Sequence, residues 1–382
     1  MGLFSFGKKK ELQAQKEHEK STVNSKETEN FVEKSEQNQY IQKAGACVVT
    51  KSLLNGSSKL KWLFRENNSI GTGWVAFGNT DTQEYINKAE NLSVVDFNTL
   101  ANIEPAVRNV FYMPYGTDLE FCFDDSGKYF VDTKTGEEIR QAVKHPVQIA
   151  FEKNLKFLNK ENYDLSFFNG LFQRSEKIQT FTVGLADFPS GSVVLADPLV
   201  YLGNKKYQTV LNRHIPKGSY KVELSIFYSN LVGIRVAAAR ININNKPAVR
   251  YELAMPKGYS IENFNEKGVF SFFGVDSGIA CITDESLADE FSDFIKEWRN
   301  KNTDKEIYND YFMQLFQKSY EKNPSLQRKN GDFLLWNLPK SNNKIIMFTS
   351  GMGDGIYSAY WGFDENGNIS NLTVPFINPE FF

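Results

Sequence analysis

The second half of this 382-residue chain is built from short apolar segments of strand type. The clearest lies at 220–228, where every second residue is apolar, a pattern typical of a strand with one buried face and one face toward solvent or a partner. Two amphipathic helical stretches, 284–299 and 304–322, interrupt the strands, with Asp284 and Thr303-Asp304 as expected N-caps. Strands, then two helices, then more strands indicate an α+β fold and not the alternation of a parallel nucleotide-binding sheet.

The strands expected in this half lie at 163–168, 178–184, 192–196, 220–228, 234–243, 249–255, 269–275, 333–336, 345–349, 357–363 and 369–374. We therefore predict a large, mostly antiparallel and sandwich-like β domain with two inserted helices over 161–382.

A smaller mixed α/β domain is predicted at 41–136. Its strands are expected at 45–50, 59–64, 73–77, 93–97, 119–123 and 128–131. Asp81 is the expected cap of a short helix, and a helical stretch at 98–110 is interrupted by Pro105. Residues 137–160 are predicted to be a helical connector between the two domains.

The first 40 residues are rich in Lys, Glu, Gln, Ser and Asn, with too few large apolar residues to offset the entropy of ordering. We predict a disordered, charged leader; a weaker alternative is that its apolar start and the lysines at 8–10 touch a membrane or a partner. Neither a signal peptide nor a membrane-spanning run of apolar residues is present, so we expect a cytoplasmic protein that does not act at membranes.

Composition narrows the function classes. A net charge of −2 argues against a nucleic-acid partner. The three cysteines, Cys47, Cys122 and Cys281, are widely spaced, which favours reduced and mostly buried thiols. Aromatic residues make up 14% of the chain and are expected mainly in the cores.

No motif for nucleophilic, phosphate-loop or zinc chemistry is present. With three histidines in all, the sequence predicts neither catalytic residues nor a histidine-rich metal site, and no cofactor is expected. A cation site built from carboxylates stays open.

Charged residues in the strands of the larger domain form one candidate ligand site. They are Asp197, Arg240, Arg250, Glu252 and Asp276. Arg250 and Glu252 have the same parity and are expected on one face of the sheet. If these residues converge, they could bind an anionic or sugar-like ligand and act as acid and base. The alternative, which we favour, is a set of cross-strand ion pairs.

A glycine-rich segment at 350–355 follows an apolar strand and precedes an aromatic one, so it lacks the helix that a phosphate loop requires. We expect a hairpin whose glycines adopt positive φ. The alternative is a flexible rim that presents Asp354 beside Tyr357, Tyr360 and Trp361 to a small ligand.

The first domain resembles the bacterial domain-of-unknown-function family classed with polymorphic-toxin immunity proteins, the thirty-third such family. The resemblance rests on CVVTK (47–51), KWLFRE (61–66), GW (73–74), DFNT (96–99), NIEP (102–105) and GT (116–117). The second domain is similar to an uncharacterised bacterial family through ADPLV (196–200), PKGSY (216–220), RVAAAR (235–240) and GDGIYSAYWG (353–362). The second family brings no activity with it.

The first resemblance implies a non-catalytic protein that neutralises a cognate toxin by binding it. Such a role needs an exposed aromatic and arginine patch, for which Trp62 with Arg65, and Trp74 with Phe77, are candidates, although each Trp is more often a core residue than an interface residue. The competing hypothesis is an enzyme or small-ligand receptor in the second domain, and a third is an adaptor that bridges two proteins. The sequence leaves the oligomeric state open.

Overall fold

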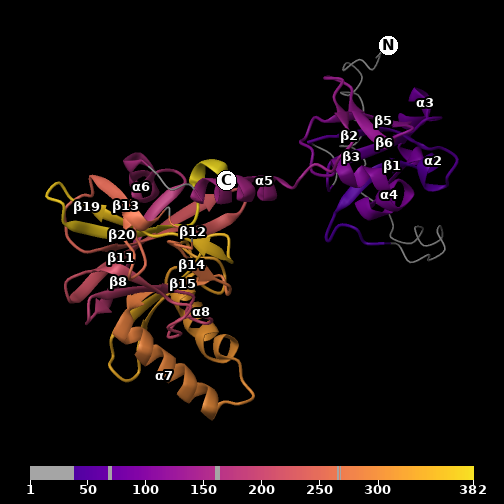
Figure 1. The fold of residues 1–382 in the computed structure, drawn as a ribbon. Helices are drawn as coiled ribbons and strands as arrows, with labels where there is room; N and C mark the ends of the chain where they lie inside the picture. The colour runs from indigo at the N-terminus through magenta and orange to yellow at the C-terminus, as the bar shows by residue number, and fades with distance from the viewer. Residues whose placement is uncertain (1–37, 68–70, 160–163, 265, 267) are drawn as a thin grey trace. The chain divides into compact units, whose positions relative to one another are not determined.

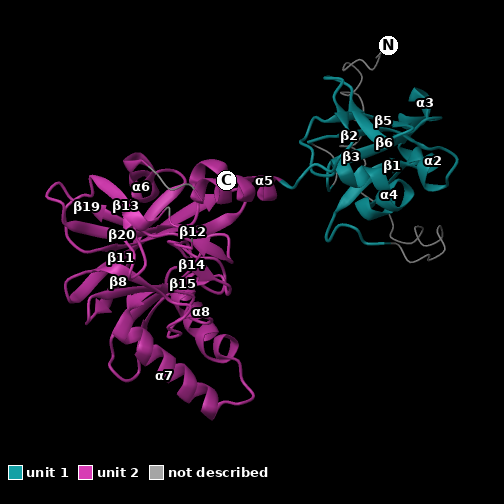
Figure 2. Ribbon diagram, viewed as in Figure 1, with its two compact units in different colours: residues 1–145 teal, residues 146–382 magenta. Residues whose placement is uncertain are grey.

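The computed structural model describes residues 38–67, 71–159, 164–264, 266 and 268–382. The chain divides into two compact units, residues 1–145 and residues 146–382 (Figure 2). The predicted leader lies outside the described residues except for its last three positions. The predicted connector contributes β7 (Glu138–Ile139) to the first unit and α5 (Pro146–Leu158) to the second.

The first unit is built on a seven-stranded sheet with the order β4-β1-β3-β2-β5-β6-β7, in which only the β1–β3 pair is parallel. Its remaining elements, in chain order, are β1 (Ala46–Thr50), α2 (Lys51–Leu54), β2 (Leu60–Arg65), β3 (Trp74–Gly78), α3 (Gln83–Ile86), η2 (Ala89–Asn91), β4 (Leu92–Asp96), α4 (Phe97–Ile103), η3 (Pro105–Val110), β5 (Asp118–Asp124) and β6 (Gly127–Asp132).

Alternation along the strands sends one set of side chains to the core of this unit. Cys47 and Val49 of β1 point inward, as do Trp74 and Ala76 of β3, and they pack with residues of α4 and η3 such as Phe97. The intervening residues of β1 and β3 face the other side of the sheet. One face therefore forms the core with α4 and η3.

The predicted cap of the short helix α3 is wrong. The Thr82 hydroxyl, not Asp81, accepts a hydrogen bond from the N–H of Tyr85 at 3.2 Å. The Asp81 carboxylate instead accepts from the Thr50 hydroxyl at 2.7 Å and from the Gly78 N–H. Asp81 thus joins the ends of β1 and β3, a long-range role that local spacing does not reveal.

The second unit is a sandwich of two antiparallel sheets. The five-stranded sheet has the order β10-β9-β15-β17-β16, the six-stranded sheet has the order β13-β19-β20-β12-β11-β8, and β14 pairs with β18. The strands are β8 (Ile178–Phe188), β9 (Ser192–Ala196), β10 (Thr209–His214), β11 (Gly218–Ser229), β12 (Gly233–Asn242), β13 (Arg250–Leu253), β14 (Phe273–Val275), β15 (Ile279–Asp284), β16 (Phe333–Asn337), β17 (Lys344–Thr349), β18 (Gly355–Tyr357), β19 (Tyr360–Phe363) and β20 (Ile369–Pro375).

Helices cover the outer faces of the sandwich (Figure 1). The other helical elements are α6 (Leu165–Phe172), η4 (Ile261–Asn263), α7 (Glu285–Lys301), η5 (Tyr308–Phe312), α8 (Met313–Lys322) and η6 (Pro379–Phe381). The two inserted helices, α7 and α8, pack on the five-stranded sheet through Phe291 and Phe316, while α6 packs on the six-stranded sheet through Phe168. The α+β class and the mostly antiparallel second domain are confirmed.

Two local predictions in this unit are wrong. The described part of the strand predicted at 163–168 is helical, because Asp164 accepts a hydrogen bond from the Phe167 N–H at 3.0 Å and Phe168 and Leu171 bury at helical spacing. The second inserted helix begins at Ile307, not at 304, and the predicted cap at Thr303-Asp304 is wrong. The Glu306 carboxylate caps its first turn by accepting a hydrogen bond from the Asn309 N–H at 2.8 Å. Strands β10 and β15 were not predicted.

Candidate functional site

Arg65 and Trp74 of the first unit hold loops together. The Arg65 guanidinium donates to the carbonyl oxygens of Thr72 at 2.9 Å and Met113 at 2.6 Å. Trp74 is fully buried and its Nε1 donates to the carbonyl oxygen of Phe111 at 3.1 Å. Trp74 is therefore a core residue, and the half-buried Arg65 uses its guanidinium to bind backbone of the unit.

Trp62 lies on the face of the sheet opposite that core. It pairs with Phe77 across the β2–β3 ladder, and the neighbouring Phe64 lies 5.1 Å from Phe77, ring centroid to ring centroid. All three rings are half-buried. On the same face, at the edge strand β4, Val94 is 55% exposed opposite Val48 of β1. Aromatic side chains are enriched in protein interfaces, which makes this face a candidate for one. We call this the outer sheet face.

Asp197 of the second unit is fully buried at the end of β9. Its carboxylate accepts backbone N–H bonds from Leu199 and Val200, at 2.8 and 3.2 Å, and from Asp276 and Ser277, at 2.9 and 2.6 Å. The Ser277 hydroxyl adds a fifth bond at 2.8 Å. Two of these donors lie in the loop after β9 and the others lie in the turn before β15. Asp197 therefore holds that loop and that turn together.

A third loop, the glycine-rich segment, lies beside these two, at the end of the five-stranded sheet where β9 and β17 end and β15 begins. The end of β17 lies beside the start of β15, since Thr349 pairs with Ile279. A Cβ atom at Gly278 would lie 3.9 Å from Oδ1 of Asp354, so this carboxylate lies beside the turn that carries Asp276. The predicted hairpin is wrong, because β17 and β18 belong to different sheets. The positive φ angles of Gly351 and Gly353 are confirmed, at 66° and 114°.

A surface hollow of about 600 Å³ opens at these loops. Asp276 and Asp354 line it, and the Tyr201 hydroxyl donates to Oδ2 of Asp276. This hydrogen bond is also the largest cause of the raised pKa of the Tyr201 phenol, because loss of its proton would place two negative oxygens together. The rest of the lining is Phe151, Leu155, Asn159, Tyr207, Phe272, Gly274, Gly355 and Ile356.

The other charged candidates lie apart from the hollow in two ion-pair groups. Arg240 binds Glu223 on the neighbouring strand at 2.6 Å and lies 3.9 Å from the Phe172 ring centroid. Burial alone would raise the pKa of Glu223, but hydrogen bonds from Lys221 and Arg240 outweigh it and hold that pKa at about 2.

The second group joins the two sheets of the sandwich. Glu252 of β13 binds Arg250 at 3.4 Å and Arg213 of β10 at 2.5 Å. Arg250 and Arg213 also lie over the Phe363 ring, at 4.0 and 5.2 Å from its centroid. The expected common face of Arg250 and Glu252 thus carries a bridge across the edge of the sandwich.

The three aromatic candidates after the glycine-rich segment are core residues. Tyr357, Tyr360 and Trp361 are 5%, 3% and 0% exposed. The Tyr357 hydroxyl donates to the carbonyl oxygen of Gly353 at 2.6 Å, so the ring supports the loop from below.

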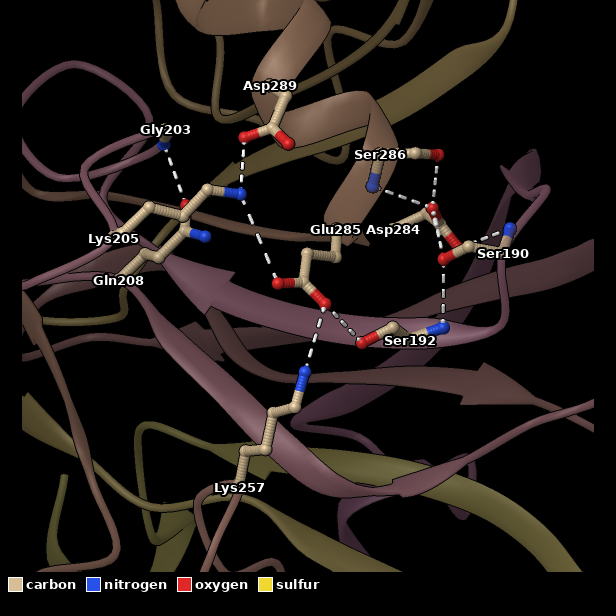
Figure 3. Close-up of polar contacts among 10 residues, drawn as sticks. All are labelled: Ser190, Ser192, Gly203, Lys205, Gln208, Lys257, Asp284, Glu285, Ser286 and Asp289. Atoms are coloured by element: carbon tan, nitrogen blue, oxygen red, sulfur yellow. Dashed lines mark hydrogen bonds and ion pairs between the residues drawn. The ribbon is translucent and has the colours of Figure 1, made fainter.

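A polar network at the start of α7 was not predicted beyond its cap (Figure 3). Asp284 caps the helix as expected, accepting from the Ser286 N–H at 3.0 Å, and it also accepts from the Gly191 N–H at 2.8 Å. Glu285 accepts from the Ser192 hydroxyl at 2.8 Å and lies 3.8 Å from Lys257. Because its hydrogen bonds join residues at the start of β9 to the first turn of α7, the network is a structural joint between the two elements. Only the cap had a sequence signal.

The described residues show no sign of a metal centre or of a membrane-spanning helix. They contain no group of three or more His, Cys, Asp or Glu side chains placed to hold a metal ion. Among them there is also no helix with the length and apolarity needed to cross a membrane.

Two family models match the chain, one in each unit. Residues 47–132 match the immunity protein Imm33 domain, a match that runs from β1 to the end of β6. Residues 186–374 match DUF4241, a family of proteins of unknown function, and span β9 to β19 together with the end of β8 and most of β20. No curated protein and no solved structure matches the chain. Both matches agree with the resemblances found in the sequence.

Proposed function

We propose that this chain is an immunity protein that binds a cognate protein toxin and neutralises it without chemical turnover. The observation that carries the proposal is the match of residues 47–132 to an immunity domain. That span contains six of the seven strands of the first unit, together with α4 and η3. The first unit is therefore the part to which toxin binding is assigned.

The outer sheet face is the surface we assign to the toxin. Trp62, Phe64 and Phe77 provide rigid aromatic area at its centre, and truncating such a residue in a protein interface costs about 2 kcal/mol or more of binding free energy. Lys61 and Glu120 form an ion pair beside Trp62. Rim charges of this kind fix the orientation of a partner more than they add affinity.

Neutralisation by binding also fits the chemistry of this unit. Its one fully buried thiol, Cys47, has a pKa raised to about 12, mainly by burial, so it is not an activated nucleophile. The Arg65 guanidinium is bound to backbone carbonyls. Covering the toxin's own functional surface requires none of these groups to react.

Co-expression with the toxin encoded beside this gene tests the proposal. Cells that produce the toxin should survive with the wild-type chain, and survival should fall with Trp62→Ala and Val94→Asp. Val249→Asp in the second unit is the matched control, since Val249 is 48% exposed and Val94 is 55% exposed. Toxicity that persists with the wild-type chain, or equal rescue by all variants, would contradict the proposal.

A further inference from the structure

We infer that the hollow in the second unit binds an organic cation, a guanidinium or ammonium group on an apolar stem. The inference concerns residues of the second unit only, so it does not rest on toxin binding by the first unit. Its basis is the combination of two carboxylates with aromatic and aliphatic walls in one hollow.

The charge of the hollow selects a cation. Asp276 and Asp354 both line it and both are exposed, while the described residues of its lining include no Lys, Arg or His. Neither carboxylate takes part in an ion pair within the described part of the chain. Two carboxylates in one hollow repel each other and any anionic ligand, and a bound cation relieves that repulsion.

Several carboxylate oxygens of Asp276 and Asp354 accept no hydrogen bond from the described residues. The Tyr201 hydroxyl occupies Oδ2 of Asp276. Within the described residues, no hydrogen bond is made to Oδ1 of Asp276 or to either carboxylate oxygen of Asp354. A guanidinium or ammonium group supplies several N–H donors and no acceptor, which complements these oxygens.

The walls of the hollow fit the apolar stem of such a ligand. Tyr201 and Tyr207 lie 5.9 Å apart, ring centroid to ring centroid, and Phe272 and Ile356 are 37% and 53% exposed. The volume, about 600 Å³, falls within the usual range of about 300–1,000 Å³ for small-molecule sites.

The framework beneath the hollow holds it in shape without a ligand. Asp197 fixes the turn that carries Asp276, and Tyr357 supports the loop that carries Asp354. The Tyr201 ring lies against Gly274, where an added Cβ would be 3.2 Å from the ring. A site held in this way loses little conformational freedom when the ligand binds.

The test is a calorimetric or NMR titration of the full-length chain with N-acetyl-arginine amide. The matched neutral probe is N-acetyl-citrulline amide, which replaces the guanidinium by a urea group of nearly the same shape. We expect the arginine probe to bind and the citrulline probe to bind at least about tenfold more weakly, the factor for one charge-assisted hydrogen bond. Equal binding of the two probes, or binding of neither, would overturn the inference.

Isosteric variants then locate the site. Asp354→Asn should weaken binding of the arginine probe by about tenfold, and the double variant with Asp276→Asn should weaken it further. Asp304→Asn changes an exposed aspartate outside the hollow and should bind like the wild type. Unchanged binding in Asp354→Asn with intact circular dichroism would refute the assignment. Two further probes distinguish the source of the guanidinium group. Tighter binding of agmatine than of the peptide Gly-Gly-Arg-Gly-Gly would indicate a free small molecule, and tighter binding of the peptide would indicate an arginine side chain of a partner.

Discussion

Asp197 accepts two hydrogen bonds from Ser277, one from the backbone N–H at 2.6 Å and one from the hydroxyl at 2.8 Å, across 80 residues of sequence. Because the carboxylate is fully buried, this contact ties two loops together where water cannot replace it. It sets the position of Asp276, and with it one wall of the hollow.

Replacing this carboxylate should therefore destabilise the second unit. We expect Asp197→Ala to lower the free energy of unfolding by about 3 kcal/mol, because it leaves several buried N–H donors without an acceptor. Asp354→Ala, which removes an exposed carboxylate of the same hollow, should change it by less than about 0.5 kcal/mol. Urea unfolding measures both. Equal stability of the two variants would show that Asp197 does not have the role assigned to it.

Glu223 should make the free energy of unfolding of the second unit depend on pH in the acidic range. Its pKa is about 2 in the folded chain and lies near 4.5 when it is exposed, so its contribution is complete above pH 4.5. The contribution is lost as the pH falls from about 4.5 to about 2 and amounts to about 3 kcal/mol.

The Glu223→Gln variant isolates this effect from the other carboxylates. The difference in free energy of unfolding between wild type and variant should be largest above pH 4.5 and shrink toward pH 2. Urea unfolding at a series of pH values gives that difference. A difference that stays constant over this range would contradict the ion pair of Glu223 with Arg240.

The three thiols should react at different rates with a disulfide reagent. Cys47 and Cys281 are fully buried and burial raises the pKa of both thiols, whereas Cys122 is half-exposed. Cys122 should label first, at a moderate rate, because burial and Glu120 raise its pKa as well. The other two should label only as their own units unfold. Rapid labelling of either remaining thiol in Cys122→Ser would be inconsistent with the structure.

Local patterns were sufficient to predict most strands and the cap of α7. Alternation in β11 and the Asp284-x-Ser286 spacing act over a few residues, so one sequence reveals them. At α6 the local pattern led to a wrong prediction of a strand, although the run of aromatic residues there has helical spacing and follows a capping aspartate. Phe168 is buried there because α6 packs on β13 and β19, which lie far along the chain.

The candidate sites were harder to predict because their members meet through sheet order. Asp197 and Asp276 adjoin only because β9 pairs with β15, and Asp354 joins them only because β15 also pairs with β17. Arg240 carries the same charge signal as a ligand-binding arginine, but its partner Glu223 is fixed by the β11–β12 register. The walls of the hollow, such as Tyr207 and Phe272, had no sequence signal that separated them from core aromatics.

The most direct test of toxin binding at the outer sheet face is calorimetry with the purified cognate toxin. The wild-type chain and Val249→Asp should form a one-to-one complex with the same Kd, and Val94→Asp should bind at least about tenfold more weakly, a loss of about 1.4 kcal/mol. No heat of binding with the wild-type chain, or equal affinity of Val94→Asp and Val249→Asp, would contradict it.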